Sequence, residues 1–304
     1  MIGHAYGAFD NSAKNYEFIQ VDPLAAAMGA EISEVDLANV SDKAFAEICH
    51  ALYRHKMIYF RDQDITHADQ ENFSAKFGPF ADDAYTQGVP GNRNVQPVLK
   101  EADAEVGIIF GSGWHTDSPF LQNPPAISQL RGIDIPPYGG DTMWANTALA
   151  YALLSETMQE MLSGLKVRMS IQHIIAASQK AVLAGEQPAK SNLKTSKDPA
   201  DMQLKVKGAA HPMVRAHPVT GEKALYCDKT YTTTIEGMLE DEAQPILDYL
   251  INHITQAALT CRLRWEPNTY AIWDNRLCIH QAFNDHDGFR REMYRTTIAR
   301  EHSA

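Results

Sequence analysis

The sequence predicts a mainly β protein with flanking helices, built on one β-sandwich or jelly-roll core. Short segments in which apolar and polar residues alternate are typical of half-buried strands, and they dominate the middle and the end of the chain. Segments with the spacing of amphipathic helices are attached to them. No internal repeat or low-complexity tract interrupts this pattern. We therefore expect the strands to pack into one layered core that carries the helices.

The first eighty residues are expected to alternate strands and helices, each helix starting at a side chain that can cap it. The predicted order is short strands within 16–37, a helix at 41–55 capped by Ser41, a buried strand at 56–60, and a helix that begins at Thr66 and ends at 78–79.

The middle of the chain begins with an irregular stretch rich in Gly, Pro, Asp and Asn, which predicts a loop from 81 to 111. A strand at 127–133, a turn at 136–140 and a second strand at 141–146 together predict a hairpin. The spacing of Leu and Met residues predicts a helix over 148–165.

The stretch from about 176 to 208 is poor in apolar residues and contains six lysines, two prolines and two glycines. A long insertion without regular structure is commonly an active-site lid or a solvated loop, and a lid is the preferred interpretation here. After it come paired strands at 212–214 and 224–226, a helix at 241–258, and strands at 261–265, 269–273 and 295–299.

Composition excludes several classes of protein. The 304 residues permit two ordinary domains or one large domain, with 44% hydrophobic and 21% charged residues as in ordinary globular proteins. A net charge of −11 argues against a general nucleic-acid surface. Four scattered cysteines suggest neither a zinc ribbon nor a redox dithiol. Without an apolar leader or an apolar run of membrane length, we expect a soluble cytoplasmic enzyme with a small ligand.

The segment around Trp114 contains a candidate metal-binding pair, His115 and Asp117. Positions i and i+2 of an extended segment face the same side, so both side chains can face one cavity. His280, between apolar neighbours in the last third of the chain, is the candidate third ligand. Two His and one carboxylate leave positions open on a non-haem Fe(II) for an organic cosubstrate and O2. The alternatives are a solvated H-x-D loop and a histidine that is simply part of the core.

Two arginines follow His280 with a spacing of four residues, Arg291 and Arg295. A guanidinium grips a carboxylate with two parallel hydrogen bonds, so an arginine beside an iron site could anchor an α-keto acid. The alternative is surface ion pairing with Asp285, Asp287 or Glu292.

Taken together and in this order, these motifs resemble the taurine dioxygenase family of Fe(II)/2-oxoglutarate-dependent oxygenases, which also contains alkylsulfatases and aryloxyalkanoate dioxygenases. The resemblance covers nearly the whole chain. The segments that carry it are 29–32, 35–37, 58–63, 77–79, 114–117, 139–142, 273–276 and the block from His280 to Arg295.

The resemblance implies a single domain over 1–304 with a double-stranded β-helix, in which His115, Asp117 and His280 hold iron. It also implies that Thr142 and Arg291 hold 2-oxoglutarate. Arg295 would face an acidic group of the substrate or support the site. The implied reaction converts 2-oxoglutarate and O2 to succinate and CO2 and hydroxylates a small organic acid, with C–S or C–O cleavage where the hydroxylated carbon bears such a bond. The family commonly forms dimers or tetramers.

The substrate side departs from the taurine-cleaving members. Where they have a sulfonate-binding His, this chain has a segment with Asp83 and Tyr85, and an Asn that often lies four residues before the H-x-D is Gly111. An aromatic residue is kept as Tyr231, whereas a neighbouring Asn is replaced by Asp228. We expect these residues to line the substrate pocket, with Asp83 or Asp228 facing a cationic or hydroxyl-bearing group. The alternative is that both aspartates are solvated.

Three other functions stay open at this point. The same cofactors could support desaturation or another oxidative outcome on an amino- or phosphono-acid. A zinc hydrolase also uses three ligands and a water, and a non-catalytic jelly roll could bind a metal for structure. Arg291 argues against the last two, because neither a hydrolase nor a binding module needs a keto-acid anchor beside an open metal site, whereas the sequence does not separate hydroxylation from desaturation.

Overall fold

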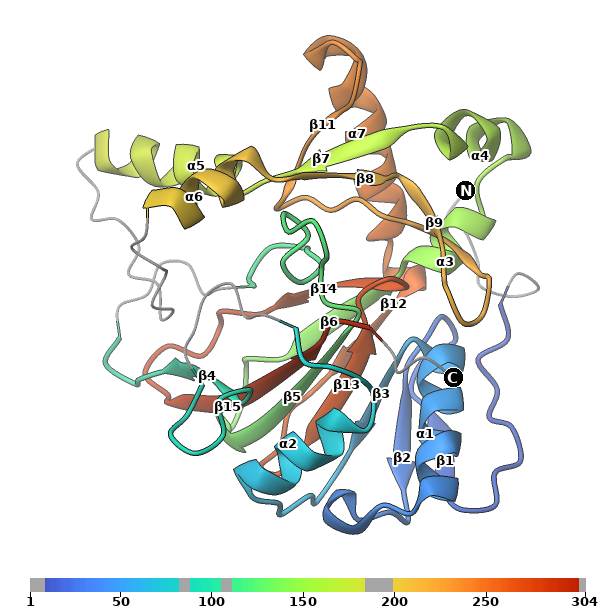
Figure 1. The fold of residues 1–304 in the computed structure, drawn as a ribbon, viewed down its shortest axis with the longest axis vertical. Coiled ribbons are helices and arrows are strands. Elements are labelled where there is room, and N and C mark those ends of the chain that lie inside the picture. Colours follow the sequence, from blue (N-terminus) through green and yellow to red (C-terminus); the bar gives the residue numbers. More distant parts are fainter. Residues whose placement is uncertain (1–8, 82–87, 105–110, 184–198, 301–304) are drawn as a thin grey trace.

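The computed structural model describes residues 9–81, 88–104, 111–183 and 199–300, and the architecture is mainly β (Figure 1). A seven-stranded sheet has the order β1-β2-β3-β13-β5-β15-β4 and is antiparallel except between β2 and β3. Its strands are β1 (Gln20–Pro23), β2 (Ala30–Ser33), β3 (Met57–Phe60), β13 (Tyr270–Asp274), β5 (Ile127–Asp134), β15 (Arg291–Ile298) and β4 (Gln96–Lys100).

Three smaller sheets complete the strand inventory of the described residues. One has the order β12-β6-β14 (Thr260–Leu263, Thr142–Asn146, Cys278–Ala282), one the order β11-β7-β8 (Thr232–Ile235, Lys166–Met169, Ala209–Pro212), and a two-stranded sheet joins β9 (Val214–Ala216) to β10 (Lys223–Leu225).

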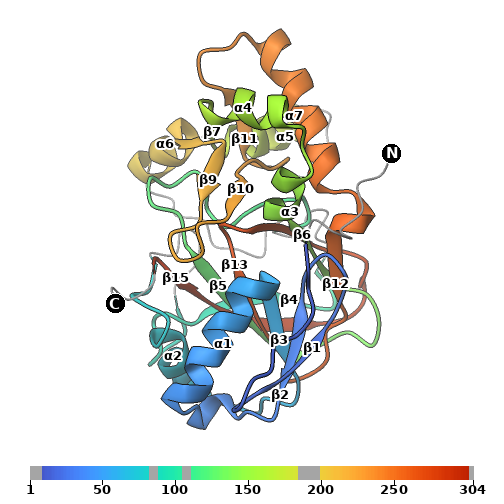
Figure 2. The same ribbon diagram turned by 90° about the vertical axis from the view of Figure 1, so that its right-hand side faces the viewer.

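Helices lie at both ends of the molecule, α1 and α2 beside the large sheet and the others around the sheet of β7 and β8 (Figure 1 and Figure 2). Their bounds are η1 (Leu37–Asn39), α1 (Asp42–His55), α2 (His67–Ala75), α3 (Thr147–Ala152), α4 (Glu156–Ser163), α5 (Gln172–Leu183), α6 (Pro199–Lys207), α7 (Glu240–Ile254) and η2 (Ala257–Leu259). Among the described residues, none of these helices is long and apolar enough to cross a membrane.

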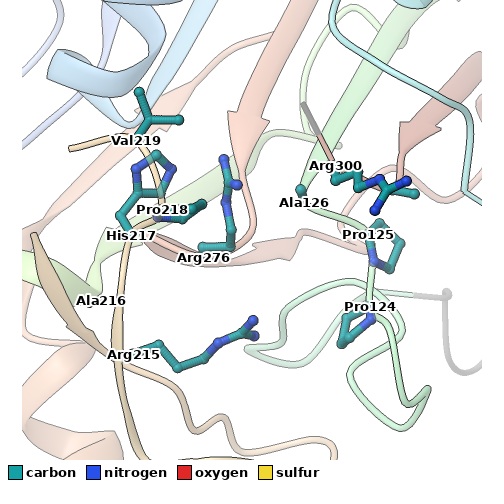
Figure 3. A pocket seen from close by; sticks show the side chains of 11 residues that line it. Pro124, Pro125, Ala126, Arg215, Ala216, His217, Pro218, Val219, Arg276 and Arg300 are labelled. Atoms are coloured by element: carbon teal, nitrogen blue, oxygen red, sulfur yellow. The ribbon is translucent and has the colours of Figure 1, made fainter. Parts of the chain in front are cut away.

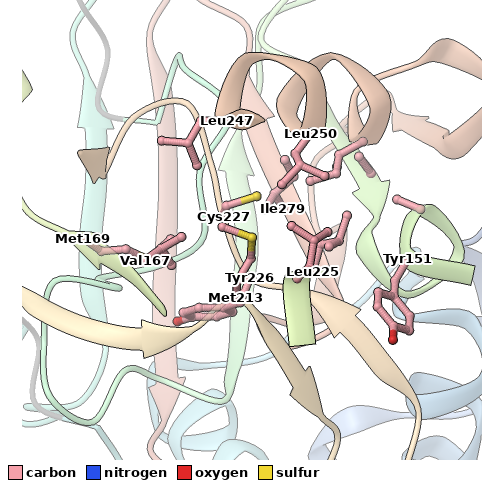
Figure 4. Packing of buried hydrophobic residues seen from close by; sticks show 14 of the residues in the cluster. Tyr151, Val167, Met169, Met213, Leu225, Tyr226, Cys227, Leu247, Leu250 and Ile279 are labelled. Atoms are coloured by element: carbon pink, nitrogen blue, oxygen red, sulfur yellow. The ribbon is translucent and has the colours of Figure 1, made fainter. Parts of the chain in front are cut away.

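Three apolar clusters hold these layers together. The first joins α1 and α2 to one face of the large sheet, where Ile48 and Leu52 pack with Phe60. The second fills the space between the large sheet and the β12-β6-β14 sheet, around Trp144 and Trp273. The third packs α3 and α7 against β7, β10 and the segment after β10 (Figure 4). Burial of this apolar surface is the main favourable contribution to folding. Residues of the second cluster also line one wall of the site described below.

Local sequence signals predicted most of the N-terminal elements correctly. The hydroxyl of Ser41 accepts a hydrogen bond from the Ala44 amide at the start of α1, and Thr66 forms a capping box with Asp69 at the start of α2. The strands within 16–37 and at 56–60 are present as β1, β2 and β3.

The predicted hairpin of 127–133 with 141–146 is wrong. β5 belongs to the seven-stranded sheet, where it pairs with β13 and β15, whereas β6 pairs with β12 and β14 in the other sheet. The turn at 136–140 therefore takes the chain from one sheet to the other. Gly139 lies in it at φ +76°, and a Cβ there would come within 2.4 Å of the Asp285 carbonyl oxygen. Alternation identifies a strand, but not its partner.

Three further predictions require correction. The predicted helix over 148–165 is two helices, α3 and α4, because Ser155 caps a new helix through the Met158 amide. The predicted loop of 81–111 contains β4. The stretch 176–208 was expected to lack regular structure, but its described parts belong to α5 and α6. Ala, Gln, Leu and Lys are frequent in both segments and are good helix formers. Residues 184–198 of the predicted lid lie outside the described residues.

Candidate metal centre

His115, Asp117 and His280 lie together and are buried, and one ligand atom from each lies within 4.8 Å of the others. The Nε2 atoms of His115 and His280 are 4.0 and 3.9 Å from Oδ1 of Asp117. These distances are too long for hydrogen bonds. They suit three ligands around one divalent ion, whose bonds to nitrogen and oxygen are about 2.0–2.2 Å long. The residues therefore fit a metal ion.

The two histidines are brought together by backbone pairing. The His115 amide donates to the His280 carbonyl at 2.9 Å, and the His280 amide donates back at 2.7 Å, which makes a two-residue β-bridge. His280 lies on β14, so this bridge attaches the segment of His115 to the β12-β6-β14 sheet. Thr116 faces away, with its hydroxyl donating to the Asn275 carbonyl at 3.0 Å.

Both imidazoles are arranged to act as neutral ligands. Nδ1 of His115 lies 2.7 Å from the Gly113 carbonyl and donates to it, which leaves the lone pair of Nε2 facing Asp117. Burial, with His115 nearby, lowers the pKa of His280 to about 3. Burial opposes ionisation of Asp117, but His280, Arg295 and His115 hold its pKa below the ordinary value. The site therefore presents two imidazole nitrogens and one carboxylate to a metal ion.

A hydrogen-bond chain that sequence reasoning missed orients Asp117. The Ser128 hydroxyl donates to Oδ2 at 2.5 Å, and the Asn275 amide donates to that hydroxyl at 2.8 Å. The Trp273 indole N–H in turn donates to Oδ1 of the Asn275 side chain at 3.0 Å. No periodicity or motif marks Ser128, because its role arises only where β5 passes behind Asp117.

The cavity at this centre is lined by the three candidate ligands together with Thr142, Arg291, Arg295 and apolar residues that include Val98, Leu130 and Trp273. The predicted cosubstrate residues Thr142 and Arg291 thus share one cavity with the triad. Thr142 accepts a 2.9 Å hydrogen bond from Trp265.

Arg291 gives this cavity a positive end. It is only 5% exposed, and its guanidinium donates to the Gly140 carbonyl at 3.1 Å. Burial lowers its pKa to about 10, so it stays cationic near neutral pH. In the described part of the chain no carboxylate forms an ion pair with it. The surface ion pairing considered for it is not observed; that role belongs to its neighbour Arg290.

Arg295 lies beside the triad. Its Nη1 is 3.5 Å from Oδ1 of Asp117, and the register of β15 with β4 places it opposite Gln96. Its side chain lines the same cavity as Arg291. Arg295 was predicted either to face an acidic group of the substrate or to support the site. The structure contains a contact of the second kind, with the carboxylate of Asp117.

Asp228 requires a correction. It is fully buried, and its carboxylate accepts hydrogen bonds from the amides of Thr116, Thr230 and Tyr231 at 3.2, 2.9 and 2.6 Å. It therefore neither faces the substrate cavity nor is solvated, and instead fixes the backbone behind the H-x-D segment. Burial raises its pKa to about 6, although these amides oppose the shift. A sequence pattern cannot reveal such a role, since it depends on the approach of two distant segments.

The other substrate candidates have different positions. The Tyr231 ring packs 5.4 Å from Phe120 and 6.2 Å from His115, measured between ring centroids, and it does not line the cavity. Gly111 does line it, and a Cβ there would lie 3.1 Å from Cε1 of His115. Asp83 and Tyr85 lie outside the described residues.

Comparison with known proteins identifies relatives over nearly the whole chain. Residues 20–297 match the profile of the "Taurine catabolism dioxygenase TauD, TfdA family". The alpha-ketoglutarate-dependent sulfate ester dioxygenase of Pseudomonas putida is 35% identical over an alignment of 294 residues that covers 93% of this chain and 90% of that protein. The alkylsulfatase of Acinetobacter baylyi is 31% identical over 285 residues, 93% of this chain and 86% of that protein.

One solved structure has a similar fold at comparable identity. The crystal structure of a taurine dioxygenase from Burkholderia xenovorans superimposes with a TM-score of 0.74 and 34% identity, and covers 93% of this chain and 89% of that chain.

Proposed function

Since the chain belongs to the taurine catabolism dioxygenase TauD, TfdA family, we propose that it hydroxylates a small organic acid at the centre formed by His115, Asp117 and His280. It is a 2-oxoglutarate-dependent non-haem iron dioxygenase and uses Fe(II), 2-oxoglutarate (alpha-ketoglutarate) and O2. In the proposed reaction 2-oxoglutarate is converted to succinate and CO2 while the substrate gains a hydroxyl group.

The observation that carries this proposal is one cavity that holds both an open three-ligand centre and a buried cation. His115, Asp117 and His280 would hold Fe(II), and Arg291 with Thr142 would hold 2-oxoglutarate. When bound, the iron couples decarboxylation of the keto acid to oxygen transfer. The protein's own part is to orient the ligands, to bind the far carboxylate at Arg291, and to exclude water with an apolar lining.

We assign the substrate to organic acids that carry an oxidisable C–H bond next to a sulfate oxygen. Two relatives that support this class are a sulfate ester dioxygenase and an alkylsulfatase. Hydroxylation of the carbon bearing the sulfate oxygen gives an unstable hemiacetal ester, which breaks its C–O bond to release an aldehyde and sulfate. Arg295 would face the anionic head if it leaves Asp117, and Leu130 and Trp273 offer an apolar wall.

The proposal also covers the remaining substrate candidates, the core fold and the oligomeric state. Asp83 and Tyr85 stay candidates for substrate contacts, and Tyr231 would support His115 from behind. We also infer that the seven-stranded sheet and the β12-β6-β14 sheet form the double-stranded β-helix of a single domain. For assembly we propose a homodimer or homotetramer.

A zinc hydrolase with the same three ligands is less consistent with Arg291. Arg291 is buried and has no ion pair among the described residues; a keto acid would supply a carboxylate to it, whereas hydrolysis needs no such cosubstrate. Desaturation on an amino- or phosphono-acid would use the same cofactors and differs only in product.

The decisive experiment measures succinate release with Fe(II), 2-oxoglutarate and O2 in the presence of alkyl sulfates, alkyl sulfonates, aryloxy acids, amino acids and phosphono acids. We expect alkyl sulfates to stimulate release most, with one aldehyde and one sulfate formed per succinate. Stimulation by a phosphono or amino acid with an unsaturated product would favour the alternative. No succinate with any acid, and no visible charge-transfer band on anaerobic addition of Fe(II) and 2-oxoglutarate, would refute the proposed function.

A further inference from the structure

A second cavity of about 580 Å³ lies away from the metal centre, and its size is that of a small-molecule site (Figure 3). Its walls come from four segments: the loop 124–126, the turn 215–219, Arg276 and the residues 299–300 that follow β15. Figure 3 shows Arg215 and the 217–219 turn on one side, Pro124, Pro125 and Arg300 on the other, and Arg276 between them.

Among the described residues, the lining carries three guanidinium groups and no carboxylate, in a chain whose net charge is −11. Asp274 compensates one of them, since it accepts hydrogen bonds from Nε and Nη2 of Arg276 at 2.8 and 2.5 Å. Within the described ranges, neither Arg215 nor Arg300 belongs to an ion pair. Arg215 is half-buried and Arg300 is exposed, so both guanidinium groups line the cavity without an ion pair among the described residues and can bind an anion that enters from solvent.

Arg215 is held in place without losing its charge. Its guanidinium lies 4.4 Å from the centroid of the Tyr226 ring, a cation–π contact that orients the group. His217 is already engaged on both nitrogens, because Nδ1 accepts from the Thr220 amide and Nε2 lies 3.0 Å from Asp274. The arginines, and not this histidine, are therefore the groups that can bind an anion.

The rest of the lining is apolar and rigid. Pro124, Pro125 and Pro218 have a fixed backbone φ, and Val219 lies at the mouth with 56% of its surface exposed. An inorganic ion would leave these surfaces uncovered. A ligand with an anionic head and a short apolar body would use both parts of the lining.

The cavity is separated from the metal centre by the turn after β13. The side chain of Asn275 in this turn donates to Ser128, on the side of Asp117, whereas the next side chain, Arg276, lines the second cavity. None of the three candidate metal ligands lines the second cavity. A ligand bound there would not touch them.

We propose that this cavity is a second binding site, for a small organic anion: a carboxylate, sulfonate or sulfate ester with a short apolar body. Arg215 and Arg300 bind the head, since guanidinium groups form charge-assisted hydrogen bonds with planar and tetrahedral oxyanions. Binding at this site requires no metal and does not depend on the proposed oxidation.

Calorimetric titration of the full chain with hexyl sulfate tests the proposal. A parallel titration of Arg295→Gln, in which the first cavity loses the arginine proposed to face a sulfate head, separates the two cavities. We expect saturable one-to-one binding to Arg295→Gln, with hydrogen-exchange protection of residues 214–219. The double variant Arg215→Gln with Arg300→Gln should bind about tenfold more weakly or worse.

Two further variants control for charge and folding. Lys223→Gln removes one positive charge from the same hairpin at an exposed position that does not line the cavity, and its affinity should stay within about twofold of the parent. Val219→Asp adds a carboxylate at the exposed mouth, where folding tolerates it, and should weaken binding.

Four results would overturn the proposal. These are the absence of saturable binding, equal affinity of the double arginine variant, equal affinity for inorganic sulfate and hexyl sulfate, and a self-association of the chain that the arginine changes abolish. The last result, seen by analytical ultracentrifugation, would assign the cavity to a second copy of the chain. Loss of succinate release with hexyl sulfate would affect the proposed function alone, because this binding is measured without iron.

Discussion

The Ser128 hydroxyl donates a 2.5 Å hydrogen bond to Oδ2 of Asp117, on the side of the carboxylate away from His280 and His115, which both approach Oδ1. One oxygen is thus fixed by the protein while the other faces the two imidazoles. Partners of this kind orient metal ligands and strengthen binding.

Ser128→Ala should weaken Fe(II) binding by about tenfold to a hundredfold, because Asp117 loses its orienting donor. Anaerobic metal titration measures this. Ser170→Ala is a matched control: Ser170 is also buried, and its hydroxyl donates to the Val206 carbonyl. Equal metal affinity in the two variants would contradict the orienting role of Ser128.

Metal binding and cosubstrate binding should separate by mutation. His115→Ala or Asp117→Ala should abolish iron binding and succinate formation, since each removes a ligand. Arg291→Ala should keep the iron and raise the 2-oxoglutarate concentration needed for half-saturation by at least about tenfold. Arg290→Ala is the control, because that neighbour pairs with Glu101 and Glu292 at the surface. Loss of iron from Arg291→Ala would refute the division of roles.

Gly139→Ala should lower the free energy of unfolding by about 2 kcal/mol or more, because a left-handed φ and a close backbone contact are both unfavourable for a Cβ. It should also raise the 2-oxoglutarate requirement, since Asp285 and Gly140 position Arg291. Gly221 has a similar φ of +73° but open space where a Cβ would lie. Gly221→Ala should therefore lose only the part of the unfolding free energy that comes from the left-handed φ. Urea unfolding and a cosubstrate titration measure the two effects.

Acid should destabilise the protein through His55. This residue lies on α1, is fully buried, and pairs through Nδ1 with Asn11 at 2.7 Å. Burial, with Arg54 and Lys56 nearby, lowers its pKa to about 4 from 6.5. Because the pKa is lower in the folded state, the unfolded chain takes up the proton at a higher pH than the folded protein does. The contribution of neutral His55 to the free energy of unfolding is therefore fully present above pH 6.5 and is lost as the pH falls towards 4.

The loss attributable to His55 should reach about 3 kcal/mol at most. Urea unfolding between pH 7 and pH 4 measures it, and His55→Gln should flatten the dependence. His50→Gln, at an exposed position of the same helix, keeps the buried imidazole of His55 and should retain most of the pH dependence. An equally steep slope in both variants would exclude His55 as the cause.

The sequence by itself determined the elements that depend on neighbours in the chain. Ser41 and Thr66 predict the starts of their helices, because an N-cap side chain bonds a backbone amide within three residues. The apolar run of β3 predicts a buried strand from neighbouring residues alone. The order of motifs, including the H-x-D of His115 and Asp117, also identified the family.

Only the tertiary structure decided which segments meet. The same alternation that marks β5 and β6 as strands made them look like a hairpin, because side-chain periodicity carries no information about the pairing partner. Asp228 looked like a substrate contact from its position in the chain, yet its carboxylate is used by three backbone amides. Ser128 behind Asp117, and the arginines around the second cavity, come from segments far apart in sequence. Local sequence patterns determine secondary structure, because caps and periodicity act between neighbouring residues. Tertiary packing determines which distant residues form the contacts of a site.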